Sequence, residues 1–423
     1  MARKMKDSGI EWIGEIPTDF SLYKLKYLLS SPLCYGANES GTLYSDILPR
    51  YIRITDISPN GTLKNSGMLS LDESSAQNYM LHEGDILFAR SGATVGKSFI
   101  YHNYYGRAAY AGYLIKASFN RLVLPEFVYY YTCSSAYEIW KNSIFIQSTI
   151  QNIGADRYSN LPISVPNSID KQLRIVRYLN NFCSKFDAII YNLQTSIEDY
   201  KKLKQAVITQ AVTKGVRGER EMKDSGVEWI GEIPVDWTIQ RFARVAEVKS
   251  NLVSPDNYLE YPQISPENIE KDSGKLLLPC KTVGEVGIIS GNHLFHKGQI
   301  LYSKIRPKLN KVCIAPFDGL CSADMYPIET NNDTRYIMYC ILSDGFLQQV
   351  SMITENRVKM PKINQTELSK LLLAMPNFLA EQKEIADYLD AKCAEIDKLI
   401  SKKEQLVKEL ESYKKSLIYE VVT

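Results

Sequence analysis

The residues from Ser91 to Ser98, SGATVGKS, resemble a loop that binds the phosphates of a nucleotide. That motif has a glycine, four further residues and then Gly-Lys-Ser/Thr, so that successive backbone N–H groups surround the phosphates. Here only three residues separate Gly92 from Gly96, and the residue before Gly92 is a serine. The corresponding segment 305–308 contains no glycine at all. We therefore predict that this loop does not bind a nucleotide.

Basic and amide side chains in the same two segments could instead bind DNA. Lys and Arg neutralise phosphates, while Arg, Asn and Gln form hydrogen bonds with base edges. Arg90 and Lys304 each follow a Gly-x-Ile-Leu-aromatic pattern, in GDILFAR and GQILYSK. A short basic run is more often a solvated loop, but two cations at one repeated position indicate a shared functional surface. The predicted DNA-binding residues are Arg90, Ser91, Thr94, Lys97, Lys304, Arg306, Lys308 and Asn310.

Patterns of catalytic and metal sites are missing from the sequence. It has no Gly-x-Ser-x-Gly turn and no Asn/Asp-Pro-Pro-Tyr/Phe tetrapeptide of an amino-methyltransferase. His293 and His296 have no nearby cysteine to complete a zinc site, and the eight cysteines are dispersed, as is typical of reduced thiols. We predict no catalytic, cofactor-binding or metal-binding residues. A self-contained DNA-modifying enzyme, either a nuclease or a methyltransferase with an unrecognised site, stays open as the alternative.

Charge is nearly balanced over the whole chain but not along it. The 423 residues include 50 Lys and Arg against 48 Asp and Glu, a net charge of +2. Residues 166–220 have 10 basic and 5 acidic residues, whereas residues 375–423 have 8 and 10. Phosphate contacts determine affinity and its salt dependence, so we expect weak, salt-sensitive DNA binding by the chain alone. No apolar stretch is long enough to span a membrane and the start lacks a secretory pattern, which predicts a cytoplasmic protein.

An internal duplication organises the chain. Residues 5–20, MKDSGIEWIGEIPTDF, match residues 222–237, MKDSGVEWIGEIPVDW, at 13 of 16 positions. A second match relates residues 165–213 to residues 375–423 at an offset of 210. The chain is thus predicted to hold two tandem copies of one unit, each with a near-constant start, a divergent middle and a near-constant end.

The ends of the two copies are predicted to be long helices that pair with each other in the same chain, the alternative being that each packs on its own domain or on another subunit. No proline or glycine interrupts the sequence between Pro166 and Gly215, or after Pro376. Apolar residues recur about every 3.5 positions, the coiled-coil period, so each helix has a stripe to bury. The divergent middles contain short β-rich runs at Tyr51–Ile57, Asp85–Ala89, Gln299–Tyr302 and Lys311–Ala315, and faint homology between them aligns Ala111–Ile115 with Asp324–Ile328. The fold class is therefore α+β, with two mixed α/β domains separated by two long coiled-coil helices.

Taken together, these features resemble the specificity (S) subunit of type I restriction–modification enzymes along the whole chain. The elements that carry the resemblance are the two KDSG(I/V)EWIGEIP segments, GDILFARSGATVGK, GQILYSKIRPKLNKV with FDGLCSADMYPI, and two proline-led helices that end in Val-Thr. The resemblance implies target recognition domain 1 at 1–165, a central spacer helix at 166–221, target recognition domain 2 at 222–374 and a C-terminal spacer helix at 375–423. It also implies that the two long helices pack antiparallel, so that the domains are related by pseudo-twofold symmetry and each reads one half of a split, asymmetric DNA site.

The resemblance further implies which molecules the chain assembles with. Double-stranded DNA is the ligand, and helix length sets the gap between the two half-sites. Two methyltransferase (M) subunits would dock on the conserved regions, and restriction (R) subunits would complete the enzyme. S-adenosylmethionine, ATP and Mg²⁺ are expected on those partners, and no cofactor is expected on this chain. The family has no catalytic role, so the chain is expected to be a DNA-recognition scaffold.

Overall fold

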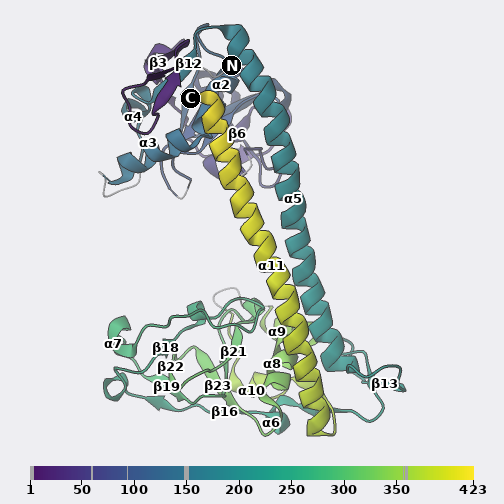
Figure 1. The fold of residues 1–423 in the computed structure, drawn as a ribbon. Coiled ribbons are helices and arrows are strands. Elements are labelled where there is room, and N and C mark those ends of the chain that lie inside the picture. Colours follow the sequence, from purple (N-terminus) through teal and green to yellow (C-terminus); the bar gives the residue numbers. More distant parts are fainter. Residues whose placement is uncertain (1–3, 59–60, 93, 147–151, 356, 358–360) are drawn as a thin grey trace. The chain divides into compact units, whose positions relative to one another are not determined.

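The computed structural model describes residues 4–58, 61–92, 94–146, 152–355, 357 and 361–423. The chain folds into two compact units. Unit 1 comprises Met1–Gln194 and Gln405–Thr423, and unit 2 comprises Thr195–Glu404. Two long helices, α5 (Ile169–Lys214) and α11 (Leu379–Val422), each contribute one part to unit 1 and the rest to unit 2 (Figure 1).

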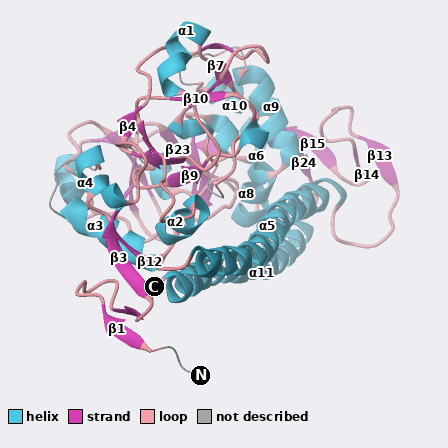
Figure 2. Ribbon diagram, turned by 90° about the horizontal axis from the view of Figure 1, so that it is seen from above, coloured by secondary structure: helices cyan, strands magenta, loops and turns pink. Residues whose placement is uncertain are grey.

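The two long helices pack against each other within each unit. In unit 1 the rings of Phe186 and Tyr413 are 5.6 Å apart. In unit 2 the Lys204 ammonium group lies 2.9 Å from the Asp397 carboxylate. The number of the contacted residue on α11 falls as the number on α5 rises, so the helices are antiparallel. Figure 2 shows the two helices side by side. The predicted pairing inside one chain is confirmed.

Local sequence sets the ends of these helices. Each begins three residues after a proline, Pro166 or Pro376. Proline has no backbone N–H to donate to a neighbouring strand. Helix α5 ends at Lys214, and Gly215 follows with φ of +76°, the left-handed conformation that commonly stops a helix.

Unit 1 is built on two four-stranded sheets. Their strand orders are β4–β11–β8–β9 and β10–β6–β7–β5, and β6 pairs with β10 in parallel. The strands of the first sheet are Cys34–Tyr35 (β4), Leu114–Ala117 (β11), Ile86–Ala89 (β8) and Ser98–Ile100 (β9). Those of the second are Ala108–Tyr110 (β10), Arg50–Ile52 (β6), Leu69–Ser70 (β7) and Thr42–Leu43 (β5).

Unit 2 also has two four-stranded sheets, of which the first repeats the strand order seen in unit 1. Its sheets have the orders β16–β23–β20–β21 and β17–β19–β22–β18, again with one parallel pair, β18 with β22. The strands of the first sheet are Glu247–Val248 (β16), Met325–Glu329 (β23), Ile300–Ser303 (β20) and Val312–Ile314 (β21). Those of the second are Leu252–Val253 (β17), Asn292–Phe295 (β19), Gly319–Cys321 (β22) and Gln263–Ile264 (β18). The divergent middles therefore share a fold.

The near-constant starts form matching strand pairs in the two units. These are β1 (Met5–Asp7) with β2 (Glu15–Pro17), and β13 (Met222–Asp224) with β14 (Glu232–Pro234). A second pair in each unit joins β3 (Phe20–Lys24) to β12 (Pro162–Pro166), and β15 (Thr238–Arg241) to β24 (Leu372–Met375).

Short helices complete both units. In unit 1 the α-helices are α1 (Glu73–Ala76), α2 (Pro125–Thr132), α3 (Ser135–Ile146) and α4 (Ala155–Ser159). In unit 2 they are α6 (Phe242–Val245), α7 (Val283–Val286), α8 (Thr334–Leu342), α9 (Asp344–Thr354) and α10 (Gln365–Leu368). The 3₁₀ turns are Leu25–Tyr27, Ile54–Asp56, Gln77–Tyr79, Asn103–Tyr105, Pro255–Asn257, Pro266–Asn268 and Pro307–Leu309.

The core of each unit includes the last turns of one long helix. In unit 1, Ile418 and Val422 of α11 are buried with Ile13 and Phe20 of the near-constant start. In unit 2 the corresponding turns of α5 supply Ile208, Ala211 and Val212 beside Trp237. No helix among the described residues is both long and apolar enough to cross a membrane.

Two details of the sequence interpretation are wrong. The run Tyr51–Ile57 is a strand only as far as Ile52, because the Asp56 carboxylate accepts the Arg53 backbone N–H at 2.8 Å and turns the chain. Aligning Ala111–Ile115 with Asp324–Ile328 is out of register by two residues. Leu114 pairs with Ala89 in unit 1, and Met325 pairs with Ser303 at the corresponding place in unit 2. Leu114 therefore corresponds to Met325. A shift of two keeps every side chain on the same face of a strand, so the apolar pattern cannot reveal it.

Candidate nucleic-acid interface

The segment of unit 1 with the phosphate-loop resemblance is a hairpin loop between β8 and β9. Gly96 donates its N–H to the Ala89 carbonyl at 2.9 Å, and its own carbonyl accepts the Tyr137 hydroxyl at 2.6 Å. Gly92 and Gly96 have φ of +79° and +82°, which glycine adopts without strain. Because the loop leads into a strand, it lacks the helix N-terminus on which a phosphate loop depends.

The four predicted DNA-binding residues of unit 1 occupy this loop with different exposure. Lys97 is exposed, and Arg90, Ser91 and Thr94 are half-buried. The Arg90 guanidinium carbon lies 4.9 Å from the centre of the Tyr35 ring, within range of a cation–π contact. Ala93 lies outside the described residues. The structure thus brings Arg90 and Lys97 to the two ends of one short loop.

The four predicted residues of unit 2 follow β20 in the same way. Arg306 and Lys308 are exposed, and Lys304 is half-buried with its ammonium group 5.3 Å from the centre of the Tyr326 ring. Arg306 has φ of +46°, a conformation that L-residues rarely adopt, and its N–H donates to the Pro361 carbonyl at 2.8 Å. Backbone strain of this kind gathers at functional sites, so Arg306 stays a candidate contact.

Asn310 does not belong on this surface. Its side chain is 1% exposed, and the amide nitrogen donates to the Ile341 carbonyl at 3.1 Å. Its φ of +41° ends the 3₁₀ turn at Pro307–Leu309, a left-handed position that asparagine tolerates better than most residues. The sequence interpretation of Asn310 as a base contact is therefore replaced by a structural role inside unit 2.

Arg90 and Lys304 occupy the same backbone position in their units. The Arg90 N–H donates to the Tyr113 carbonyl at 3.0 Å, and its carbonyl accepts the Ile153 N–H at 2.9 Å. The Lys304 N–H donates to the Asp324 carbonyl at 3.0 Å, and its carbonyl accepts the Ile363 N–H at 2.9 Å. The repeated Gly-x-Ile-Leu-aromatic pattern therefore places one cation at one point of a shared fold.

A buried histidine lies near Lys304. His293 of β19 is 3% exposed, and its Nδ1 atom has no hydrogen-bond partner among the described residues. Burial lowers the pKa of His293 and the positive charge of Lys304 lowers it further, against a hydrogen bond to the Ala323 backbone. The lowered pKa favours the neutral form of the imidazole, which does not balance the charge of Lys304.

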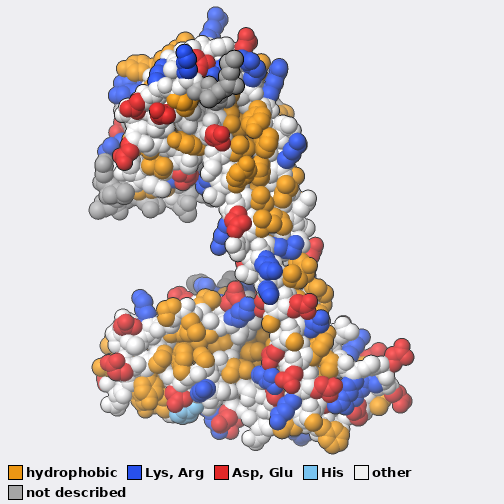
Figure 3. Space-filling view, viewed as in Figure 1, with side chains coloured by type: hydrophobic (Ala, Val, Ile, Leu, Met, Phe, Trp, Pro, Cys, Tyr) orange, Lys and Arg blue, Asp and Glu red, His pale blue; other side chains and the backbone are white. Residues whose placement is uncertain are grey.

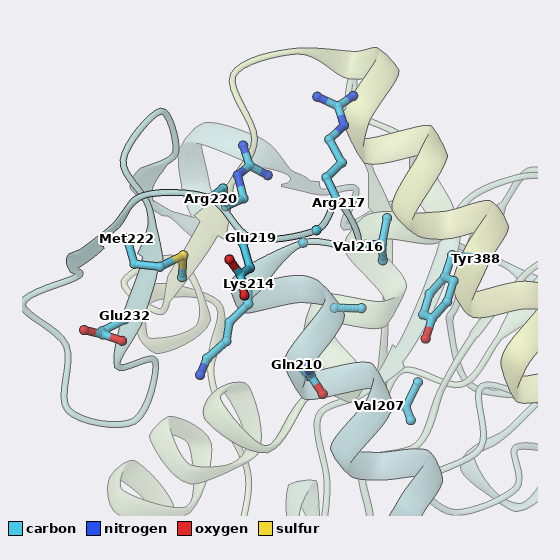
Figure 4. Close-up of a pocket in the computed structure, with 13 residues that line it drawn as sticks. Val207, Gln210, Lys214, Val216, Arg217, Glu219, Arg220, Met222, Glu232 and Tyr388 are labelled. Atoms are coloured by element: carbon cyan, nitrogen blue, oxygen red, sulfur yellow. The ribbon is translucent and has the colours of Figure 1, made fainter.

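A pocket of about 460 Å³ in unit 2 lies where α5 ends and β13 begins (Figure 4). Arg217 and Arg220 line it, but their charges are already paired. Arg217 lies 2.7 Å from the Glu384 carboxylate, and Arg220 lies 2.6 Å from Glu381. None of the predicted DNA-binding residues lines this pocket. The two arginines therefore form ion pairs at the junction between a long helix and the next strand pair.

Comparison with known proteins identifies the family. The sequence pattern described as "Type I restriction modification DNA specificity domain" matches residues 44–199 and 234–409. The chain belongs to this family. Each of the two matches covers most of one divergent middle together with part of a long helix, so the duplication seen in the sequence is a duplication of the family's domain.

Similar proteins agree with this identification. The type I restriction enzyme EcoDI specificity subunit of Escherichia coli is 33% identical over 279 residues, which cover 62% of this chain and 62% of that protein. The MjaVIII specificity subunit of Methanocaldococcus jannaschii is 22% identical over 367 residues, covering 81% of this chain and 79% of that protein. The aligned region thus spans less than two thirds of the E. coli subunit.

A solved structure shares the fold of this specificity subunit. It comes from a study of complex assembly and conformational transition of the type I restriction–modification system. Its TM-score is 0.66 at 13% identity, with 96% of this chain and 98% of that chain covered. The predicted family and fold class are confirmed. Specificity subunits are non-catalytic, so family membership supports the prediction that this chain is not an enzyme.

The sequence interpretation missed three residues beside the two cations. Tyr35 belongs to no motif, and although Tyr326 lies in the segment FDGLCSADMYPI and His293 in a His-x-x-His pair, neither pattern connects them to Lys304. The only sequence signal is the high tyrosine content, 28 residues, which does not distinguish these two tyrosines from the rest.

Proposed function

We propose that this chain is the DNA sequence-recognition subunit of a type I restriction–modification enzyme, with one target recognition domain at 1–165 and the other at 222–374. The observation that carries the proposal is the family match in both units, combined with a cation at the same backbone position in each. The loops around the two cations differ in sequence, so each domain reads its own half of an asymmetric DNA site. The segments 166–221 and 375–423 act as spacer helices whose length sets the gap.

The chain also acts as a scaffold for partner subunits in this proposal. An aromatic stripe made of Tyr178, Phe182, Phe186 and Tyr413 lies on the long helices in unit 1, with adjacent ring centres 4.9, 6.1 and 5.6 Å apart. Tyr178 is 43% exposed and Tyr413 is 57% exposed. Figure 3 shows hydrophobic side chains gathered along this part of the helices. An exposed apolar patch is typical of a protein interface and supports docking of a methyltransferase subunit there.

Catalysis and cofactors belong to the partners in this proposal. Two methyltransferase subunits supply S-adenosylmethionine chemistry, and restriction subunits supply ATP- and Mg²⁺-dependent cleavage, in the cytoplasm where the cellular DNA lies. Among the described residues no group of three His, Cys, Asp or Glu side chains could hold a metal ion. Assays of the purified chain alone for methyl transfer, nicking and ATP hydrolysis test this division. Robust activity that one point substitution abolishes would instead favour a self-contained enzyme.

Methylation-aware sequencing tests the recognition function. DNA from cells that express the chain with its methyltransferase partner should carry methylated bases in one split, asymmetric sequence. Cells that express the methyltransferase partner without this chain are the control and should lack that pattern. Methylation at the same sites in the control would contradict the proposal.

A further inference from the structure

The two corresponding cations share an unusual environment. Among the described residues, no side chain or carbonyl accepts a hydrogen bond from the Arg90 guanidinium, and its Nε atom is buried without a partner. Most charged groups that leave water are paired with an opposite charge. Here the guanidinium instead lies over the ring of Tyr35. Its positive charge is held in place without being neutralised.

Tyr35 is itself held in place by the segment 153–155, which also contacts Arg90. The Tyr35 hydroxyl oxygen accepts the Ala155 N–H at 3.0 Å, where α4 begins. Two residues earlier in the same segment, the Ile153 N–H donates to the Arg90 carbonyl at 2.9 Å. The ring, the cation and the segment 153–155 therefore form one connected unit, and the tyrosine sets where the guanidinium can lie.

Unit 2 builds the same arrangement from different residues. The Lys304 ammonium group lies over the Tyr326 ring, and the Tyr326 hydroxyl donates to the Ile363 carbonyl at 3.3 Å. The Ile363 N–H in turn donates to the Lys304 carbonyl at 2.9 Å. The nearby Asp324 carboxylate accepts a hydrogen bond from the Lys362 ammonium group at 3.1 Å, so its charge is already paired with a different lysine.

The supporting tyrosine comes from a different strand in each unit. Tyr35 lies on β4, whereas Tyr326 lies on β23, whose counterpart in unit 1 is β11. Two divergent sequences have thus reached one arrangement, a cation over a tyrosine that is tied to the following segment. A solvated loop would not require this arrangement, so the position of the cation itself is the feature that both units maintain.

An aromatic partner suits a cation that must bind something else. A carboxylate would neutralise the cation and occupy its N–H donors, whereas a ring attracts the charge through its face and leaves the donors free. The planar guanidinium of Arg matches the O6 and N7 acceptors of guanine in the major groove with two hydrogen bonds. The Lys ammonium group offers a compact charge without the rigid, planar arrangement of N–H donors that Arg has.

From this geometry we propose that Tyr35 and Tyr326 are positioning residues for base recognition, and that Arg90 over Tyr35 reads one guanine in the half-site of unit 1. Lys304 over Tyr326 makes the corresponding contact in the half-site of unit 2. The proposal rests on the proposed function, since it concerns how the same surface recognises DNA. It assigns a role to two tyrosines that do not themselves contact the bases.

The test is selection from a randomised DNA duplex library by the full chain co-purified with its methyltransferase subunits, at one fixed salt concentration. Tyr35→Leu should reduce the preference for guanine at one position of one half-site by roughly 3- to 30-fold, the range expected for loss of a cation–π contact. The other half-site should be unchanged. Tyr35→Phe, which keeps the ring and loses only the bond to Ala155, should keep most of the preference. Tyr326→Leu should act on the other half-site alone.

Matched variants separate positioning from folding. Tyr27→Leu removes another exposed tyrosine that lies under a lysine, with Lys26 at 5.1 Å from its ring, and should leave both half-sites unchanged. In an Arg90→Ala background, Tyr35→Leu should cause no further loss of base preference, because the positioned group is already gone. An unchanged guanine preference in Tyr35→Leu, or a uniform loss of affinity across all sequences, would overturn the inference while leaving the proposed function intact. A wild-type complex that selects no sequence would overturn both.

Discussion

The ammonium group of Lys204 lies 2.9 Å from Oδ1 of Asp397, in a contact that joins α5 to α11 inside unit 2. Both side chains are mostly buried, at 9% and 20% exposure, and Lys275 adds a second cation 2.8 Å from Asp397. Burial would raise the pKa of Asp397, but hydrogen bonds from Lys275 and Lys204 outweigh burial and hold it below the ordinary value of 3.8.

Breaking this ion pair should destabilise unit 2. Lys204→Met leaves a partly buried carboxylate with only Lys275, and we expect a loss of about 1–3 kcal/mol in the free energy of unfolding. The double variant Lys204→Met with Asp397→Leu should recover most of that loss, because the unpaired charge is then absent. Denaturant unfolding of the full chain measures both effects. Lys201→Met, which removes an exposed pair with Glu198, is the control and should change little.

The same pair gives a pH dependence with a defined sign. The folded-state pKa of Asp397 lies below its unfolded value, so its contribution to stability is complete above pH 3.8 and is lost as pH falls through the folded pKa. Asp397→Asn should therefore flatten the acid limb of the unfolding curve of unit 2. An acid limb that the substitution leaves unchanged would show that other carboxylates control it.

His293 should make unit 2 less stable in mild acid. Its folded-state pKa lies below the ordinary value of 6.5 because of burial and then Lys304, so the unfolded chain binds a proton that the folded chain does not. Stability should fall as pH decreases below about 6.5 and level off below the folded pKa. Thermal unfolding of His293→Gln should lose this dependence. His296→Gln removes an exposed imidazole and should behave like the wild type.

The last turn of α11 should be essential to unit 1. The Tyr419 hydroxyl donates to the Ile13 carbonyl at 2.9 Å, and the Ser164 hydroxyl donates to the Val422 carbonyl at 2.7 Å. Ile418 is 1% exposed, so Ile418→Ala should cost about 2–4 kcal/mol. Hydrogen exchange should accelerate in β12 of unit 1 and stay unchanged in β24 of unit 2. Leu406→Ala, at a position 42% exposed, should have a much smaller effect.

Arg306 and Asn310 should give different phenotypes although only three residues separate them. Arg306→Ala removes an exposed cation, and if that cation reads a base it should relax one position of the DNA site at a cost of about 1–3 kcal/mol. Asn310→Ala removes a buried hydrogen bond to Ile341, so it should lower thermal stability and leave the ranking of DNA sequences unchanged. Quantitative binding to the cognate site and its single-base variants separates the two. Altered base preference in Asn310→Ala at full stability would contradict its structural role.

Periodicity and repetition made the framework of the chain predictable from sequence. The absence of proline and glycine between Pro166 and Gly215 was enough to predict α5, and the repeated GDILFAR and GQILYSK segments predicted that Arg90 and Lys304 follow corresponding strands. Both features are local, since helix formation and strand ends depend on nearby residues.

Contacts between distant segments were not predictable in this way. Tyr35 lies 55 positions before Arg90, and no motif connects a strand residue to a loop so far along the chain. Asn310 was misinterpreted because asparagine is suited both to base edges and to left-handed backbone positions, and only its burial decides between them. The two-residue error in the strand alignment also arose from an ambiguous local pattern. Side chains on one face of a strand recur every two residues, so a shift of two leaves the apolar pattern unchanged.

The independence of the two recognition domains is the central claim, and a domain exchange tests it most directly. Residues 21–164 would be replaced by the corresponding segment of another family member, and methylated sequences would be read by methylation-aware sequencing in cells that also express the methyltransferase subunit. We predict that one half of the recognised sequence changes while the other half and the gap stay as in the wild type. A change in both halves would contradict the account.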